Sequence, residues 1–183
     1  MKLCKPGAAQ SSGRTEDNQK MKYGTYTIAR EYDARGKIDE WMQLFLRNDG
    51  HNLALADGLL LKERRYIGIR RIPLLLLAQI QSGAPEYLHD QDSIDYFFQV
   101  VDKMKQDCMN WDIPPLIVEY GENGFHVDDG RHRLEMYRQM GVTHAPAALW
   151  TTGERLEERL LALLEGCERE APVVGNSGCF KRD

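Results

Sequence analysis

The sequence contains little cysteine. Its four cysteines, Cys4, Cys108, Cys167 and Cys179, are far apart in 183 residues, and none belongs to a Cys-x-x-Cys pair. Zinc ribbons need such close pairs, and small domains held together by disulfides need a higher density of cysteine. The pattern therefore argues against both classes and favours reduced thiols in a cytoplasmic protein.

The sequence also lacks a long apolar run. The longest stretch, Pro73–Leu77 with its neighbours, is much shorter than the roughly 20 apolar residues that a membrane helix needs. Residues 1–22 contain no apolar signal-peptide core. We therefore expect no membrane partner and no secretion.

Positive charge is not in excess either. The net charge is -4 and the pI is about 5.8, so the chain as a whole has no basic field that would attract nucleic acid. Two local basic pairs, Arg64-Arg65 and Arg70-Arg71, keep a nucleic-acid partner open, but this partner is not favoured.

The overall composition is that of an ordinary globular protein, with 42% hydrophobic and 28% charged residues, and the length allows a sizeable core. Residues 1–22 are rich in glycine, serine and charge, which predicts a disordered lead-in. A helical extension is predicted at residues 23–63. The main domain, with a C-terminal helix, is predicted at residues 64–170, and a flexible tail is predicted at residues 171–183.

The spacing of apolar residues predicts an α+β fold. Helical spacing is found at residues 38–47, 53–61, 92–109, 131–140 and 156–167, and strand-like patterns occur at residues 66–72, 116–119, 125–127 and 147–150. The Asn-Gly turn at Asn123 predicts that the second and third strands form an antiparallel hairpin. We expect a small mixed sheet flanked by helices, preceded by the helical extension and followed by a helix.

Two of these helices have capping signals at their N-termini. Asp92 or Ser93 precedes the first apolar residues of the helix expected at 92–109 and can cap it. Thr151 and Glu154 have the spacing of a capping box, which predicts the start of the last helix.

The stretch HVDDGRHRLEMYRQMG, residues 126–141, concentrates charge where a strand is expected to lead into a helix. Gly130 would allow a positive φ and a close approach of the backbone to a ligand. The first amides of the following helix have no intrahelical acceptor, and with the helix dipole they attract phosphate or sulfate. The stretch is therefore typical of an anion-binding turn.

The side chains around this turn suit the same chemistry. Arg131, His132 and Arg133 supply further donors, and an arginine matches the geometry of a phosphate. Asp128 and Asp129 would hold a magnesium ion, activate a hydroxyl or cap the helix. A structural interpretation competes, because an aspartate before a helix is a common cap and helical arginines commonly face solvent.

The segments "RRIPLLLL" and "PPLIVEYGENGFHVDDGRHRLEMYRQMGVTHAPAALW" resemble the ParB/sulfiredoxin superfamily over a little under half of the chain. The resemblance implies that family's fold. It also implies that Gly130, Arg131 (mainly by its backbone amide), His132 and Arg133 bind nucleotide phosphates. Asp129 matches the acid of the motif, which implies a catalytic or metal-binding role.

The branches of this superfamily differ in activity. Sulfiredoxins have a catalytic cysteine where this chain has Arg131, so their activity is not expected. Partition proteins bind CTP, usually have Gly-Glu-Arg-Arg in the phosphate loop and add a helix-turn-helix domain, for which too few residues follow Trp150. The motif is most similar to the Asp-Gly-His-His-Arg version of stand-alone members such as free-serine kinases.

The resemblance to these kinases implies magnesium-dependent transfer of a phosphoryl group from ATP or ADP to a small hydroxyl acceptor, or nucleotide hydrolysis, with CTP as an alternative nucleotide. It also implies a catalytic glutamate after the first strand, and Glu86 lies at roughly that place. Two alternatives stay open: a DNA-binding protein or nuclease, and a nucleotide-binding regulator without turnover. The sequence does not identify the acceptor or the oligomeric state.

Overall fold

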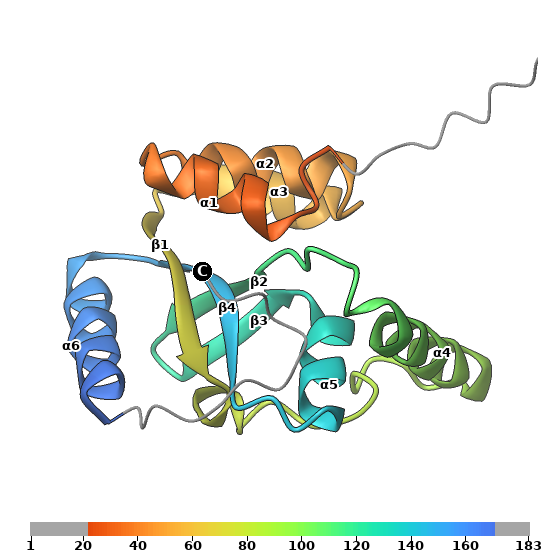
Figure 1. The fold of residues 1–183 in the computed structure, drawn as a ribbon. Helices are drawn as coiled ribbons and strands as arrows, with labels where there is room; N and C mark the ends of the chain where they lie inside the picture. Colours follow the sequence, from red (N-terminus) through yellow and green to blue (C-terminus); the bar gives the residue numbers. More distant parts are fainter. Residues whose placement is uncertain (1–21, 171–183) are drawn as a thin grey trace, which may run out of the picture.

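A four-stranded mixed sheet organises the computed structural model, which describes residues 22–170 (Figure 1). The strands are β1 (Arg65–Pro73), β2 (Leu116–Gly121), β3 (Gly124–Asp129) and β4 (His144–Thr151). The α-helices of these residues are α1 (Tyr26–Ala34), α2 (Ile38–Asn48), α3 (Leu53–Leu60), α4 (Gln91–Asp107), α5 (Arg131–Gln139) and α6 (Glu154–Glu170), and a 3-10 turn, η1 (Leu74–Leu77), follows β1. The predicted α+β class is confirmed.

The strand order is β1-β4-β2-β3. β4 pairs in parallel with β2 and antiparallel with β1, and β2 and β3 form the predicted antiparallel hairpin. Apart from Lys22, the expected lead-in at 1–22 and tail at 171–183 lie outside the described residues. Between residues 22 and 170, no helix has both the length and the apolar character needed to cross a membrane.

Helices cover both faces of the sheet (Figure 1). One face packs against α1–α3, and Ile117 and Trp150 are buried in that core. The other face packs against α4, α5 and α6, and Val118 and Leu149 are buried there. Burial on both faces explains why β2 and β4 have nearly continuous apolar sequences, since alternation is typical of strands with one wet face.

A bulge interrupts the β2–β3 hairpin at two adjacent acidic residues, Asp128 and Asp129. Ile117 pairs with Asp129 but Val118 pairs with Val127, so Asp128 is an additional residue in β3. Neighbouring residues of a regular strand point to opposite faces, and a bulge interrupts that alternation. Asp128 contacts Trp150 on the sheet face that α1–α3 cover, and Asp129 contacts Asn52 at the start of α3.

The capping predictions for α4 and α6 were wrong. Asp90 caps α4, because its side chain accepts a hydrogen bond from the amide of Ser93 at 2.8 Å. Thr151 belongs to β4, where its hydroxyl donates to the carbonyl of Tyr120 at 2.6 Å. The carbonyl of Gly153 accepts the first hydrogen bond of α6 instead. In both cases residues that could cap were present, and the tertiary structure selected a neighbour.

Candidate functional site

The turn between β3 and α5 has the backbone conformation that its glycine allows. Gly130 has a φ of 105°, a value that other residues rarely adopt. A methyl group at this position would lie 2.8 Å from Leu116 Cδ2 and 2.9 Å from Arg133 Nη2. No side chain caps the N-terminus of α5, so its first amides are available to an anion.

We expect Gly130→Ala to destabilise the protein by about 1 to 3 kcal/mol, because the alanine would be strained at this φ and crowded against Leu116. Urea unfolding measures the change. Gly58→Ala is the matched control: Gly58 lies inside α3 with nothing within 4 Å of the added methyl group, so the control should gain about 0.5 to 1 kcal/mol. Equal stability of the two variants would contradict the strain at Gly130.

Arg133 is buried, with a side chain that is only 6% exposed. Its Nη1 donates to the carbonyls of Pro114 at 2.8 Å and Pro115 at 2.6 Å, and its Nη2 donates to Asp129 Oδ2. The guanidinium also lies over the ring of Phe45 at 5.6 Å. These contacts tie α5 to the segment that enters β2, so Arg133 shapes the turn as well as supplying positive charge to it.

Asp129 is the partner of Arg133 at this turn. Its side chain is 16% exposed, and its second oxygen, Oδ1, accepts a hydrogen bond from Asn52 Nδ2 at 3.4 Å. Both carboxylate oxygens therefore have a partner within the protein. Because each carboxylate oxygen has two lone pairs, Asp129 keeps the capacity to accept further bonds.

A cavity of about 220 Å³ opens at the Gly130 turn. Its walls are formed by Gly24, Phe45, Asp49, Gly50, Met104, Trp111, Pro114, Asp129, Gly130, His132 and Arg133. The structure thus brings together four of the residues predicted from the motif. It adds residues from the helical extension, which the sequence gave no reason to place here.

Asp49 is the acidic residue that sequence reasoning missed. In the sequence it follows the helix expected at residues 38–47 and precedes a glycine, as at many helix ends. Its carboxylate accepts hydrogen bonds from the amides of Tyr23 at 2.5 Å and Gly24 at 2.8 Å. This interaction closes the start of the extension over the cavity. An Asp-Gly pair after a helix is too common to reveal such a contact from sequence.

His132 faces the same cavity and stacks on Phe97, with ring centroids 4.4 Å apart. Burial lowers the pKa of His132, and the charge of Arg133 lowers it further, while Asp129 acts in the opposite direction. The imidazole is therefore neutral at neutral pH. In this state it supplies one donor and one acceptor instead of a full positive charge.

Asp128 forms a separate chain of contacts. One of its oxygens lies 2.8 Å from His126 Nδ1, and the other accepts a hydrogen bond from Trp150 Nε1 at 2.9 Å. Burial raises the pKa of Asp128, although the contacts with His126 and Trp150 counteract the shift. Asp128 is not among the residues that line the cavity, so the two adjacent aspartates occupy different environments.

The two remaining predicted residues lie toward the loop after η1. The Arg131 side chain donates to the carbonyl of Gln81 at 3.1 Å, which leaves its backbone amide at the start of α5 as its contribution to the turn. Glu86 is exposed in that loop and does not line the cavity. Its catalytic role stays a prediction.

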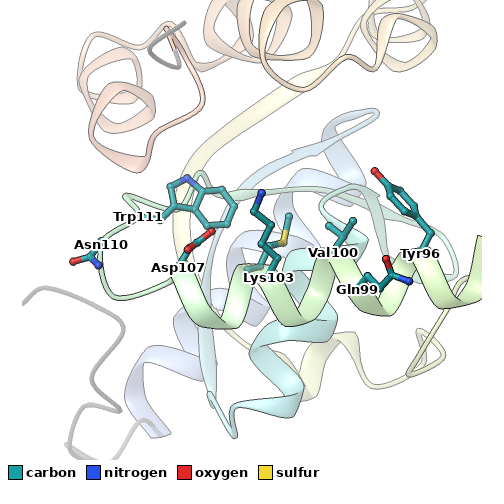
Figure 2. Close-up of a pocket in the computed structure, with 8 residues that line it drawn as sticks. Tyr96, Gln99, Val100, Lys103, Asp107, Asn110 and Trp111 are labelled. Carbon is teal, nitrogen blue, oxygen red and sulfur yellow. The ribbon is translucent and has the colours of Figure 1, made fainter. Parts of the chain in front are cut away.

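A larger groove of about 890 Å³ runs along α4 (Figure 2). It is lined by Tyr96, Gln99, Val100, Lys103, Met104, Asp107, Asn110 and Trp111. Met104 and Trp111 also line the small cavity, so the two spaces adjoin. The side chains of Tyr96, Val100 and Lys103 project from the same side of the helix, as their spacing of three and four residues requires.

No protein-family model matches the chain, and no curated protein has a matching sequence. Membership of the ParB/sulfiredoxin superfamily therefore stays a prediction.

Proposed function

We propose that this protein binds a nucleotide, with the phosphates at the Gly130 turn, and transfers a phosphoryl group to a small hydroxyl acceptor in the cytoplasm. The observation that carries the proposal is the uncapped N-terminus of α5, which begins at a glycine with positive φ beside Arg133 and His132 in one cavity. The order strand, helix, hairpin, helix, strand from β1 to β4 agrees with the order that the ParB/sulfiredoxin resemblance implies.

The sizes of the two spaces suggest how a nucleotide would be divided between them. The cavity of about 220 Å³ is smaller than the roughly 300 to 1,000 Å³ of sites that enclose a drug-sized ligand. It is large enough for the phosphate end only. The adjoining groove along α4, with Tyr96 at its edge and Trp111 at the junction (Figure 2), offers aromatic and apolar surface to the nucleoside.

The charges at the turn suit a magnesium nucleotide. Asp49 and Asp129 face the cavity together with a single arginine, and His132 is neutral, so the phosphates would need an additional cation. Between residues 22 and 170 no three His, Cys, Asp or Glu side chains are grouped to hold a metal ion. Magnesium is commonly held by one or two carboxylates, waters and the phosphates themselves, and Asp129 would be the protein ligand.

Asp129 also has the position expected of the catalytic carboxylate. It directly precedes the glycine at which the phosphates would dock, so its carboxylate reaches the same cavity as the α5 amides. There it would orient the acceptor hydroxyl or the metal, while Arg133 and His132 would stabilise the charge that develops on the phosphoryl oxygens. ATP and ADP are the expected donors, and CTP is the alternative.

Thermal unfolding with ATP, ADP, CTP and inorganic tripolyphosphate, each with and without magnesium, tests the binding site. A ligand at a hundred times its Kd adds about 2.7 kcal/mol to stability, or about 5 to 10 °C in Tm. We expect magnesium-dependent shifts with a nucleotide and with tripolyphosphate. If none of the four ligands raises the Tm, with or without magnesium, the proposal is contradicted.

A pair of α4 variants tests the division of the ligand. Val100→Asp places a charge in the groove and should weaken nucleotide binding without affecting tripolyphosphate. Gln106→Asp places the same charge on an exposed part of α4 outside the groove and should leave both unchanged. If Val100→Asp lowers the affinity for tripolyphosphate as much as the affinity for nucleotide, the substitution acts on the phosphate site and the proposed division of the ligand is wrong.

One observation favours a second function, a nucleotide-binding regulator without turnover. Both oxygens of Asp129 have partners, Arg133 and Asn52, as expected of an acid with a structural role. Binding of nucleotide without phosphorylation of any hydroxyl acceptor, and without nucleotide hydrolysis, would select this function.

A further inference from the structure

The helical extension contacts the acid of the Gly130 turn through one side chain. Asn52 precedes α3, and its Oδ1 caps that helix by accepting a hydrogen bond from the amide of Leu55 at 3.2 Å. Its other side-chain atom, Nδ2, donates to Asp129 Oδ1 at 3.4 Å. A single amide group therefore links the start of α3 to a residue 77 positions later in the chain.

Asn52 is itself held firmly in place. Its backbone amide donates to the carbonyl of Leu46 at 2.9 Å, and the preceding residue, His51, has a φ of 49°. The side chain of Gln43 in α2 donates to the carbonyl of Ala56 at 2.8 Å, which joins α2 to α3. A side chain fixed by a cap, a backbone bond and two packed helices can define the direction of its partner.

Each oxygen of the Asp129 carboxylate accepts one of these hydrogen bonds. Arg133 holds Oδ2 from the side of α5, and Asn52 holds Oδ1 from the side of α3. With only one of them, the carboxylate could rotate about the bond to its Cβ. With both, the plane of the carboxylate is set relative to the cavity.

We propose that Asn52 is a positioning residue that orients the Asp129 carboxylate for phosphoryl transfer, and that the helical extension is thereby part of the active site. This inference rests on the proposed function. An asparagine suits the task because its amide donates without adding a positive charge that would compete with a bound metal ion. Its oxygen meanwhile serves the helix.

Two substitutions separate this role from the cap. Aspartate and serine are both good N-caps, so Asn52→Asp and Asn52→Ser keep the bond to Leu55 and remove the donor to Asp129. Asn52→Asp also places a like charge beside it. Asn48→Asp is the control for charge, since Asn48 is exposed at the end of α2 and its side chain donates to the carbonyl of Leu44 at 2.6 Å.

Turnover and nucleotide affinity should respond differently. Misplacing a reacting group by about 1 Å can cost on the order of a hundredfold in rate, so we expect kcat to fall at least about tenfold in Asn52→Ser and further in Asn52→Asp. Nucleotide Kd and Tm should change little in Asn52→Ser, and Asn48→Asp should behave as the wild type. A role limited to packing would lower Tm and leave the kcat of the folded protein unchanged.

Each result decides the matter. If the wild type turns over and both Asn52 variants have the same kcat as the wild type, the inference is overturned and the proposed function stands. A wild type that binds nucleotide without turnover overturns the inference together with the phosphotransferase, but not the binding site. A fall in kcat accompanied by an equal loss of nucleotide affinity also overturns it, because an orienting contact acts on the reacting group.

Discussion

Replacing Arg133 by methionine is expected to lower the free energy of unfolding by about 3 to 5 kcal/mol, the usual cost of leaving a buried charge without its partner. The variant would remove the donors to Pro114 and Pro115 and leave Asp129 without its cation. For a chain of this size the loss corresponds to about 6 to 20 °C in Tm. Urea unfolding and thermal unfolding monitored by circular dichroism measure it.

Two further variants show whether the uncompensated charge causes the loss of stability in Arg133→Met. Arg155 pairs with Glu122 at the surface, so Arg155→Met should cost less than about 1 kcal/mol. The double variant Arg133→Met/Asp129→Leu removes both charges and should recover part of the stability lost by the single change. An Arg133→Met protein within about 1 kcal/mol of the wild type would contradict the structural role of this arginine.

Asp129→Asn is expected to lower turnover by about a hundredfold or more while changing nucleotide affinity only a few-fold. Groups that act on the proton or charge of the reacting atoms typically contribute a hundred- to ten-thousandfold, and their contacts matter most in the transition state. Asparagine keeps an oxygen that accepts from Arg133 and removes the negative charge. Phosphorylation of the hydroxyl acceptor and consumption of nucleotide measure the effect.

Asp128→Asn is the matched control for this experiment. It makes the same chemical change one residue earlier, where the side chain contacts His126 and Trp150 outside the cavity. We expect its turnover to stay within a few-fold of the wild type. If Asp129→Asn turns over as fast as the wild type, the Asp129 carboxylate is not catalytic, and the phosphotransferase proposal loses its central residue.

Much of the fold could be predicted because its signals are local. The Asn-Gly turn specified the hairpin of β2 and β3, and the apolar period specified α2 and α4. The caps were less predictable, since Asp90, Asp92 and Ser93 all suit an N-cap and only the path of the chain selects one of them. α1 was covered only by the general expectation of a helical extension, because its apolar residues are few.

The phosphate turn shows how far the sequence reaches. The residue types Gly130, Arg131, His132 and Arg133 at a strand-to-helix junction predicted an anion site, and Gly130 does adopt a positive φ at the start of α5. This follows from sequence because the amides, the dipole and the glycine all belong to one short segment. The three hydrogen bonds of the buried Arg133 side chain could not be predicted, since two of them are accepted by the carbonyls of Pro114 and Pro115.

The sequence by itself determined the α+β class, the hairpin and the chemistry concentrated around Gly130, all of which depend on residues close together in the chain. Only the tertiary structure decided that Asp49 and Asn52 join that turn, that the adjacent Asp128 and Asp129 at the β3 bulge have different partners, and that the cavity adjoins the groove of α4. The reason is physical: these features come from packing the helical extension and α4 around the sheet, and such long-range contacts leave no periodic pattern in the sequence.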